Sequence, residues 1–351
     1  MSEAIRTGTL ILGAGPAGLA VAACLRRLDL PFLILEQGDR VGAIWGQHYD
    51  RLHFNTDSRH SGLPYWPWPK GSPRYPSRQE MLDYLEGYAR RFGLEPRFGR
   101  RVCSAERRGD GWLVQTDRPG HETYEARNLV IATGLNRLPH RPTWAGQEGY
   151  LGEVLHSAEY RNGSPFRGQR VLVVGFGNSG AEIAVDLYEH GALPAMAARS
   201  PARIVPREIL GVPLLYFAVP MRALSEKLGQ RKKPKLPVID VGIRRLVREG
   251  KVMVRPGIAC FTCTGVQFAD GVAEDFDAVI LATGYQPGLT DFLNGAEAAL
   301  DETGLPYICG QESVVPGLFF CGLSIPPTGL LREIGIEAHR IANAIAVAVE
   351  H

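Results

Sequence analysis

The hydrophobic pattern of the chain starts with a short apolar run that leads into a cluster of glycines. Thr9 to Leu12 has the length and composition of a buried strand, and Gly13, Gly15 and Gly18 follow it with GxGxxG spacing. In such a turn one glycine allows the tight bend, the second lets the backbone approach a phosphate, and the third lets helix and strand pack closely. The pattern therefore predicts a strand, a turn and a helix that together hold a pyrophosphate.

A second apolar run, Phe32 to Leu35, ends in an acidic residue, Glu36. Glu36 lies about 20 residues beyond Gly13, where a carboxylate can accept hydrogen bonds from both hydroxyls of an adenosine ribose. A lone glycine-rich turn is weak evidence, because many such turns serve geometry only, but the terminal carboxylate favours a dinucleotide site. The cofactor-binding residues expected here are Gly13, Gly15, Pro16, Ala17, Gly18, Glu36 and Gln37.

The same strand, turn and helix pattern occurs a second time, from Val171 onwards. The position that matches Glu36 by spacing is Ala198, and Arg199 and Ser200 follow it. With no carboxylate to repel it, a ribose 2′-phosphate can be held by the guanidinium and the hydroxyl, although a solvated surface arginine is the simpler alternative. We therefore expect FAD at the first site and NADPH at the second. The residues expected at the second site are Gly175, Gly177, Asn178, Ser179, Gly180, Arg199 and Ser200.

An internal repeat indicates how the two sites are arranged along the chain. Two apolar runs end in the same tripeptide, Ala132-Thr133-Gly134 and Ala282-Thr283-Gly284, and the second turn lies between them. This order predicts an α/β fold with two Rossmann-like dinucleotide-binding domains, the NADPH domain being inserted into a discontinuous FAD domain. We expect FAD-domain parts at 1–163 and 268–351 and the NADPH domain at 164–267. Both tripeptides and Tyr285 are expected at the cofactors.

The remaining hydrophobic pattern predicts connecting elements and a substrate channel. The loop from Arg51 to Pro76 is long, aromatic and Pro-rich, and Ser77 with Glu80 is typical of a capped helix start. Alternating residues from Val102 to Tyr124 predict a β-meander. Leu210 to Met221, within segment 206–240, is rich in Leu, Val and Phe, so we expect it to line a channel for an apolar or aromatic substrate, with a membrane-facing patch as the alternative.

Composition excludes several other classes of protein. The chain has 351 residues, of which 45% are hydrophobic, and a net charge of +2. This charge is too small to indicate electrostatic attraction to nucleic acid or to an anionic membrane. No segment has the length of a membrane span and no signal peptide is evident, so we expect a cytoplasmic protein with reduced cysteines. Cys260 and Cys263 have CxxC spacing but fall in a β-like run, which favours a structural role. His48, His53 and His60 have no ligand pattern around them, and no metal is expected.

The segment between the two sites resembles a known family fingerprint. Tyr150 to Arg161 fits FxGxxxHxxxY of the flavin-containing monooxygenases, with Tyr150 at the leading Phe and with His156 and Tyr160 at the fixed positions. An ordinary interdomain pair is the alternative interpretation of those two residues. The likeness covers nearly the whole chain and is closest to the YUCCA-type branch. Its landmarks are Asp50-Arg51-Leu52, Tyr75-Pro76-Ser77-Arg78-Gln79, Tyr84-Leu85-Glu86, the second glycine-rich turn, Arg199-Ser200, Pro206-Arg207-Glu208 and Ala282-Thr283-Gly284-Tyr285.

The resemblance implies the chemistry and the residues that support it. NADPH would reduce FAD, the reduced flavin would react with O2 to a C4a-(hydro)peroxide, and one oxygen atom would pass to a small substrate by N- or S-oxygenation or by oxidative decarboxylation of a 2-oxo acid. Asn55 is the expected catalytic residue, beside the flavin and nicotinamide. Trp45 would line the flavin site. The turn before the last helix would direct the helix N-terminus at the reducible edge of the flavin. Further cofactor-binding residues are then His156, Tyr160, Gly322, Gly329 and Leu330.

Some features limit the transfer from that family. Phe54-Asn55-Thr56 is more similar to the general flavin monooxygenases than to the YUCCA branch, the segment from Gly211 to Pro237 is shorter, and no Asp follows Gly322. The alternatives are a Baeyer–Villiger monooxygenase, in which Trp usually stands at Tyr160, an NADPH-dependent flavoprotein reductase or disulfide oxidoreductase, and a flavin-bound sensor without turnover. Nucleic acid and integral membrane contact are not expected, and a homo-oligomer is left open.

Overall fold

The chain forms two compact units. The computed structural model describes residues 4–117, 122–214, 216–217, 237–326 and 328–350. The first unit comprises Met1–Gly46, Thr56–Leu138 and Tyr285–His351, and the second comprises Gln47–Asn55 and Pro139–Gly284. None of the helices in the described ranges is both long and apolar enough to cross a bilayer.

The first unit is built on a mixed sheet with the order β2-β1-β5-β4-β3-β20, and β21 also pairs with β5. The strands β2, β1, β5 and β21 run parallel, whereas β5, β4 and β3 form the antiparallel meander that the sequence predicts. Strand β1 is an interior strand between β2 and β5, and its second half is apolar and buried on both faces. The bounds are β1 Ile5–Leu12, β2 Phe32–Leu35, β3 Val102–Arg108, β4 Gly111–Thr116, β5 Thr123–Ile131, β20 Leu293–Asn294 and β21 Leu318–Phe320.

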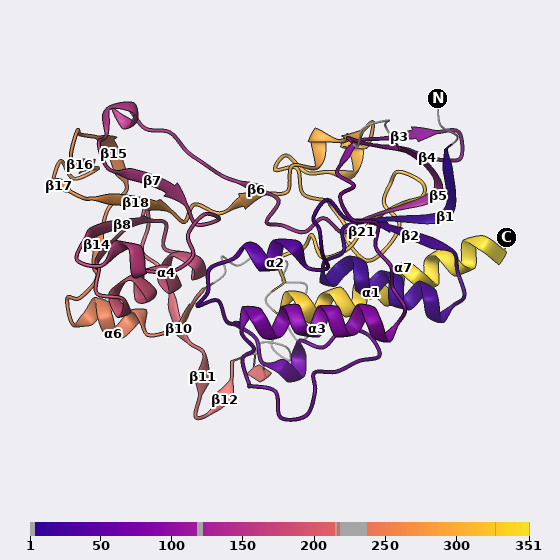
Figure 1. The fold of residues 1–351 in the computed structure, drawn as a ribbon, viewed down its shortest axis with the longest axis horizontal. Helices are drawn as coiled ribbons and strands as arrows, with labels where there is room; N and C mark the ends of the chain where they lie inside the picture. Colours follow the sequence, from indigo (N-terminus) through magenta and orange to yellow (C-terminus); the bar gives the residue numbers. More distant parts are fainter. Residues whose placement is uncertain (1–3, 118–121, 215, 218–236, 327, 351) are drawn as a thin grey trace, which may run out of the picture. The chain divides into compact units, whose positions relative to one another are not determined.

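Helices cover the sheet of the first unit. Helix α1 (Pro16–Arg27) is buried along most of its length and lies beside the C-terminal helix α7 (Leu330–Glu350), as Figure 1 shows. Helix α3 (Arg78–Arg91) begins at the expected capping box, in which Ser77 and Glu80 exchange side-chain to backbone hydrogen bonds. Short elements complete the unit: α2 Ala43–Gln47, η1 Ser58–His60, η4 Leu289–Asp291 and η5 Glu297–Ala299.

The second unit contains a parallel five-stranded sheet with the order β14-β9-β8-β18-β7. Helices α4 (Asn178–Glu189) and α6 (Ile243–Arg248) pack together, and their buried residues share one apolar cluster with β8. The sheet strands are β7 Glu153–His156, β8 Arg170–Val174, β9 Leu193–Ala197, β14 Met253–Arg255 and β18 Ala278–Leu281.

Smaller elements complete the described chain. A three-stranded antiparallel sheet, β15-β16-β17, packs its aromatic residues against the other apolar cluster of the second unit. The remaining bounds are β6 Leu138–Pro139, which pairs with β19 Tyr285–Gln286, η2 Gln147–Gly149, η3 Ser164–Phe166, β10 Ile204–Pro206, β11 Glu208–Ile209, β12 Val212–Pro213, β13 Val238–Asp240, β15 Ile258–Phe261, β16 Gly265–Phe268 and β17 Ala273–Asp275.

The unit boundaries differ from the expected divisions at 163/164 and 267/268. Both expected divisions fall inside the second unit, because β7 and β18 pair with one another and β18 pairs with β8. Residues 47–55 also cluster with the second unit, although they lie far from it in the sequence. The strand pairings link residues more than a hundred positions apart, so no local sequence pattern predicts them.

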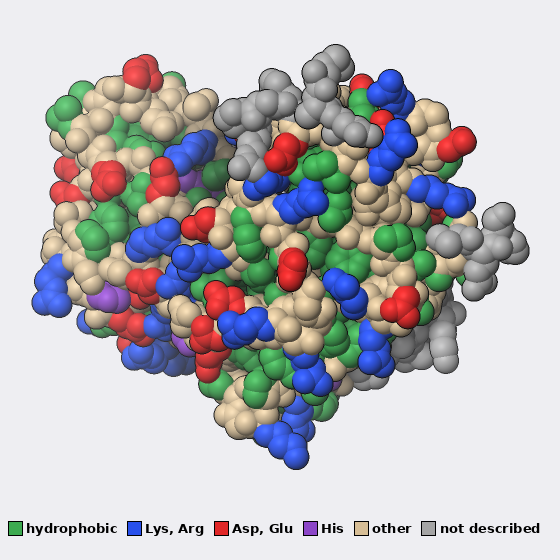
Figure 2. Space-filling model, turned by 45° about the vertical axis from the view of Figure 1, so that its right-hand side comes forward, with side chains coloured by type: hydrophobic (Ala, Val, Ile, Leu, Met, Phe, Trp, Pro, Cys, Tyr) green, Lys and Arg blue, Asp and Glu red, His purple; other side chains and the backbone are tan. Residues whose placement is uncertain are grey.

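Charges of both signs are mixed on one face of the molecule. On the face drawn in Figure 2, Lys and Arg side chains alternate with Asp and Glu side chains, and apolar side chains lie between them. This distribution agrees with the near-neutral net charge of the sequence.

An aromatic stack orders the long loop before α3. The Tyr84 ring lies between Trp66 and Trp68, with ring centroids 5.1 and 4.4 Å away and nearly parallel planes. The Tyr84 hydroxyl accepts a hydrogen bond from the Leu63 N–H (2.9 Å) and donates one to the Trp66 carbonyl (2.5 Å). One buried hydroxyl therefore satisfies two backbone groups of the loop, and burial raises its pKa to about 12.

Replacing Tyr84 by Phe is expected to destabilise the first unit. The substitution keeps the stacked ring but leaves two loop backbone groups without this partner, which costs about 1–3 kcal/mol of unfolding free energy. Chemical denaturation of the purified protein measures the loss, and limited proteolysis locates it in the loop. Tyr307→Phe removes an equivalent hydroxyl from a side chain that is 71% exposed, so it is expected to have no effect. Equal stability of the two variants would contradict the assigned role of Tyr84.

Candidate functional site

The first glycine-rich turn is fixed by strand contacts on both sides. The Gly13 N–H donates to the Leu35 carbonyl at 2.7 Å, and the Ala132 N–H donates to the Leu12 carbonyl at 2.9 Å. Gly13 has a φ of +109°, and a Cβ there would lie 2.5 Å from the Ala132 carbonyl oxygen. A side chain at Gly18 would overlap the Gly13 carbonyl. Both positions therefore require glycine for the fold itself.

Gly15 differs from its two neighbours in the turn. Its backbone is extended (φ −83°, ψ −172°), it is the N-cap of α1, and a Cβ there would meet nothing within 4 Å. No side chain caps the helix, which begins at Pro16. The first-turn N–H groups and the positive end of the helix dipole therefore adjoin open space in front of Gly15. This cradle fits an anionic pyrophosphate.

Glu36 is buried at the end of β2, and its carboxylate is held in place by backbone donors. One carboxylate oxygen accepts from the Ala14 N–H at 2.8 Å and the other accepts from the Gly38 N–H at 2.7 Å. A carboxylate has about four acceptor positions, so each oxygen retains capacity for a further donor. The arrangement joins the turn to the carboxylate and suits the ribose contact expected for Glu36.

The two Ala-Thr-Gly tripeptides differ in their threonine hydroxyls. The Thr133 Oγ1 atom is buried and makes no hydrogen bond with the described residues. The Thr283 hydroxyl instead donates to the His140 carbonyl at 2.5 Å. A buried hydroxyl without a partner is costly, so Thr133 marks a place where a bound molecule can supply the missing contact. Thr133 directly follows Ala132, whose carbonyl faces Gly13, so this observation and the glycine cradle agree on the fit of FAD to the first unit.

The second turn repeats the geometry of the first. The Gly175 N–H donates to Ala197 at 2.9 Å and Gly175 has a φ of +112°. A Cβ at Gly175 would overlap the Ala282 carbonyl, whereas one at Gly177 would meet nothing within 4 Å. Gly177 is the N-cap of α4, again without a side-chain cap. The second unit thus has its own anion cradle at the N-terminus of a twelve-residue helix.

Arg199 and Ser200 follow strand β9 and are exposed. Ala198 precedes them, and its N–H donates to the Arg255 carbonyl of the neighbouring strand at 3.0 Å. Arg199 packs against Gly257, where an added Cβ would approach the Arg199 side chain to 3.2 Å. An exposed guanidinium at this strand end, in the absence of a carboxylate at position 198, suits a phosphate ligand.

His156 is engaged by the backbone of its own unit. Its Nδ1 atom accepts from the Ala158 N–H at 3.1 Å, so the ring proton is on Nε2, which donates to the Gly284 carbonyl at 3.1 Å. The residue is fully buried, and burial lowers its pKa below the usual value. A neutral His156 thus ties the end of β7 to the last residue of the second Ala-Thr-Gly tripeptide.

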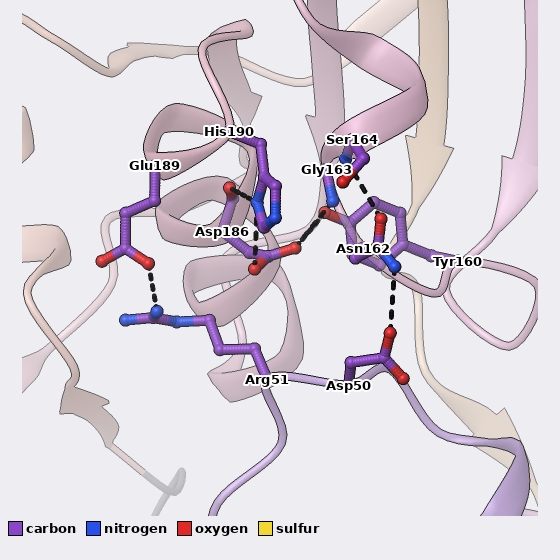
Figure 3. Close-up of polar contacts among 9 residues, drawn as sticks. All are labelled: Asp50, Arg51, Tyr160, Asn162, Gly163, Ser164, Asp186, Glu189 and His190. Carbon is purple, nitrogen blue, oxygen red and sulfur yellow. Dashed lines mark hydrogen bonds and ion pairs between the residues drawn. The ribbon is translucent and has the colours of Figure 1, made fainter.

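Tyr160 directs its hydroxyl at helix α4. It donates to the Asp186 carboxylate at 2.6 Å, and the Gly163 N–H donates to the same oxygen at 2.9 Å (Figure 3). Burial and the adjacent carboxylate raise the Tyr160 pKa. His190 lies on the other side, with Nδ1 2.8 Å from the Asp186 carbonyl. The polar groups of both fingerprint side chains are therefore used within the second unit, and their expected contact with a cofactor stays a prediction.

The remaining expected residues lie at several places in the chain. Asn55 is exposed at the end of the segment 47–55, and Trp45 is half-buried on α2. Gln37 is exposed after Glu36, and Tyr285 begins β19. Gly329 (φ +93°) directly precedes Leu330, the first residue of α7. Of the expected channel segment, residues 215 and 218–221 lie outside the described residues, and Leu210 is fully exposed at the tip of the β11–β12 hairpin.

Sequence reasoning missed a buried carboxylate beside Gly322. Glu337 of α7 accepts from the Gly322 N–H at 2.7 Å and from the Ser324 hydroxyl at 3.0 Å, and burial raises its pKa. Gly322 itself adjoins Ala17 of α1, because a Cβ at Gly322 would lie 2.9 Å from the Ala17 Cβ. The signal in the sequence was an acidic residue on the apolar face of a helix. Its role can be interpreted only when the groups packed against it are known.

Two cysteines with CxxC spacing are free thiols. Cys260 lies on β15 and its Sγ is 3.5 Å from the Gln267 side chain, while Cys263 is exposed after the strand. Cys260 thus lies in the small antiparallel sheet of the second unit and Cys263 in the turn between its first two strands, and neither lies at the start of a helix.

Two dinucleotide cradles, one with a terminal carboxylate and one with an exposed guanidinium, define a flavoprotein oxidoreductase that uses a pyridine nucleotide. Residues 10–205 match the family described as "Pyridine nucleotide-disulphide oxidoreductase". The chain is 37% identical to "Indole-3-pyruvate monooxygenase YUCCA4" of Oryza sativa subsp. japonica, over 90% of this chain and 83% of that protein. It is also 37% identical to "Probable indole-3-pyruvate monooxygenase YUCCA7" of Arabidopsis thaliana, over 96% and 88%.

A solved structure gives the same result. The "Flavin-containing monooxygenase from Stenotrophomonas maltophilia" has a TM-score of 0.82 at 26% identity, covering 98% of this chain and 99% of that chain. The chain belongs to the flavin-containing monooxygenase family. It is accordingly an FAD- and NADPH-dependent monooxygenase that uses O2 and a small-molecule substrate.

Proposed function

We propose that the protein oxidatively decarboxylates an aryl 2-oxo acid of the indole-3-pyruvate type. The observation that carries this proposal is the 37% identity, over most of both chains, to proteins named indole-3-pyruvate monooxygenases. In the balanced reaction the 2-oxo acid, O2, NADPH and one proton give the acid one carbon shorter, CO2, NADP⁺ and water. One atom of O2 enters the new carboxylate and the other leaves as water.

The two cradles supply the cofactor sites in this proposal. The turn Gly13–Gly18, Glu36 and the Thr133 hydroxyl would hold FAD, supported by the open space at Gly15 and the unsatisfied hydroxyl. Gln37, Trp45, Ala132, Gly134, Gly322, Gly329 and Leu330 are assigned to the same cofactor. The turn Gly175–Gly180, with Arg199 and Ser200, would hold NADPH, and Ala282, Thr283, Gly284 and Tyr285 are assigned to its surroundings.

Bound FAD supplies the hydride acceptor and the group that activates O2. The chain's own residues bind the cofactors, orient the reacting groups and exclude water. The α1 N-terminus and its free backbone donors neutralise pyrophosphate charge, and Glu36 orients the ribose. Arg199 selects NADPH over NADH through the 2′-phosphate. The neutral His156 keeps the second Ala-Thr-Gly tripeptide in place through Gly284. Asn55 offers both an amide donor and a carbonyl acceptor to the reacting groups.

A substrate panel tests the proposed reaction. The purified holoenzyme is given NADPH and ¹⁸O₂ with indole-3-pyruvate, phenylpyruvate, an alkyl aryl sulfide, a tertiary amine and cyclohexanone. We expect the 2-oxo acids to release CO2 in proportion to NADPH, with one ¹⁸O in the shortened acid by mass spectrometry. Formation of a sulfoxide or an N-oxide without release of CO2 would contradict the proposed decarboxylation and favour S- or N-oxygenation. Formation of a lactone from cyclohexanone would favour the Baeyer–Villiger alternative.

Asn55→Ala is expected to uncouple turnover. Removing one amide hydrogen-bonding group costs about 0.5–1.5 kcal/mol, which corresponds to a fall of about 2- to 10-fold in product formed per NADPH. Oxygen uptake and H2O2 release measure the fall, because reducing equivalents that miss the substrate appear as H2O2. Cys260→Ser with Cys263→Ser serves as the comparison and is expected to retain coupling. Loss of all turnover in the double serine variant with normal FAD content would favour a disulfide reductase.

The cytoplasmic location and the oligomeric state remain predictions. Cell fractionation tests the first, and sedimentation equilibrium of the holoenzyme tests the second.

A further inference from the structure

Residues 47–55 form a strap that belongs to the second unit. In the sequence they follow α2 and precede the loop of the first unit, yet they cluster with residues 139–284. The strap ends at Asn55, the residue proposed to act in catalysis. What holds the strap therefore decides where the Asn55 side chain is placed within the second unit.

The central anchor of the strap is a buried pair. The Tyr49 hydroxyl donates to the Glu182 carboxylate of α4 at 2.7 Å, and both residues are buried, with 3% and 4% of their surface exposed. Tyr49 also packs its ring beside Tyr160, with centroids 6.4 Å apart. Glu182 lies in the same helix that begins at the Gly177 cradle, so the anchor joins the strap directly to the helix of the second dinucleotide turn.

Further contacts hold the strap on both sides of Tyr49. The Asp50 N–H donates to the Arg161 carbonyl at 2.8 Å, and the Asp50 carboxylate accepts from the Asn162 side chain at 2.9 Å. Arg51 pairs with Glu189 at the far end of α4. Figure 3 shows the Asp50 and Arg51 side chains pointing to these partners, next to the Tyr160–Asp186 bond.

The last residues of the strap are held as well. Arg207 donates to the carbonyl of Phe54, which is buried directly before Asn55. The His53 ring contacts the Arg51 carbonyl at 2.6 Å, and Leu52 packs against the apolar cluster around α4. The backbone is thus fixed up to the residue before Asn55.

We propose that Tyr49 and Glu182 are positioning residues that hold Asn55 in place for oxygen transfer. The inference rests on the catalytic role proposed for Asn55. A buried carboxylate is costly, since burial raises the Glu182 pKa, and an apolar pair of similar volume would stabilise the unit at least as well. The polar pair instead fixes one distance and one direction, which is what a hydrogen-bonding group beside a reacting centre requires.

The test compares coupling among matched variants of the holoenzyme. Tyr49→Phe removes the hydroxyl and keeps the ring, so we expect product per NADPH to fall by about 2- to 10-fold, as for Asn55→Ala. Glu182→Gln keeps an acceptor for Tyr49 and is expected to restore most of the coupling that Glu182→Ala loses. FAD content and the KM for NADPH are expected to stay near wild type in all of them.

The control is a tyrosine–glutamate pair of the first unit, in which the tyrosine is buried and Glu122 is half-buried. Tyr124 is fully buried in the first unit and donates to the Glu122 carboxylate, also at 2.7 Å. Tyr124→Phe therefore deletes the same kind of bond at a place without a proposed role in catalysis. We expect it to lower thermal stability while leaving product per NADPH unchanged.

Three results decide the inference. Non-additivity supports it: the double variant Tyr49→Phe/Asn55→Ala should be no less coupled than Asn55→Ala alone. If Asn55→Ala uncouples the enzyme and Tyr49→Phe does not, the positioning role is overturned and the proposed function stands. If Asn55→Ala itself leaves coupling intact, the catalytic role of Asn55 fails and the positioning role fails with it.

Discussion

Gly15→Ala is expected to give a folded protein that has lost most of its affinity for FAD. The added methyl group meets no protein atom within 4 Å and the backbone at Gly15 is extended, so the fold tolerates it. The same methyl group would occupy the space in front of α1 that fits the pyrophosphate. A steric conflict of this kind costs about 1–3 kcal/mol, or about 5- to 150-fold in the dissociation constant. Fluorescence titration of the apoprotein with FAD measures it.

Gly177→Ala is the reciprocal experiment, because the two positions have the same geometry. Gly177 is also an N-cap with extended backbone and open space around its Cβ position. This variant is expected to keep its FAD and to raise the KM for NADPH by a similar factor. Circular dichroism and thermal unfolding of both apoproteins are the controls for folding.

The pair of variants tests the assignment of the cofactors. If Gly177→Ala lost FAD and Gly15→Ala kept it, the two sites would have to be exchanged. If both variants bound both cofactors normally, neither turn would contact a pyrophosphate.

Arg199→Ala is expected to weaken NADPH and to leave NADH almost unaffected. A charge-assisted hydrogen bond to the 2′-phosphate contributes about 1.5–3 kcal/mol, so the KM for NADPH should rise by about 10- to 100-fold. NADH lacks that phosphate, so its kinetic constants measure any general disturbance. Steady-state oxidation of both nucleotides at fixed ionic strength gives the ratio.

Arg244→Ala is the matched control for Arg199. It removes the same charge from an exposed arginine of the second unit, on α6, and is expected to leave both KM values unchanged. An equal rise in the KM for NADPH and NADH in Arg199→Ala would exclude recognition of the 2′-phosphate.

The sequence predicted those parts of the fold that depend on local patterns. The apolar runs before both glycine-rich turns are buried parallel strands, and each turn opens a helix as expected. The capping box at Ser77 and the antiparallel meander also agree with the structure. These features are decided within a few residues by chain geometry and hydrogen bonding, which is why a single sequence is sufficient for them.

The positions of the unit boundaries could not be predicted in the same way. The strand pairing that keeps β7 and β18 with β8 is set by which apolar edges meet in three dimensions. The strap is a stronger case, because in the sequence its residues lie within the first domain. Its contacts with the second unit, such as those of Tyr49, Asp50 and Arg51 with partners on or beside α4, become visible only in the tertiary structure.

The sequence by itself determined that there are two turns and that they differ, because Glu36 and the Ala198–Arg199 pair stand at fixed spacings from their glycines. Only the tertiary structure decided that Thr133 has an unsatisfied hydroxyl while Thr283 does not, and that Tyr160 bonds to Asp186. The physical reason is that a polar side chain's role depends on its partners. Those partners come from distant segments that packing brings together.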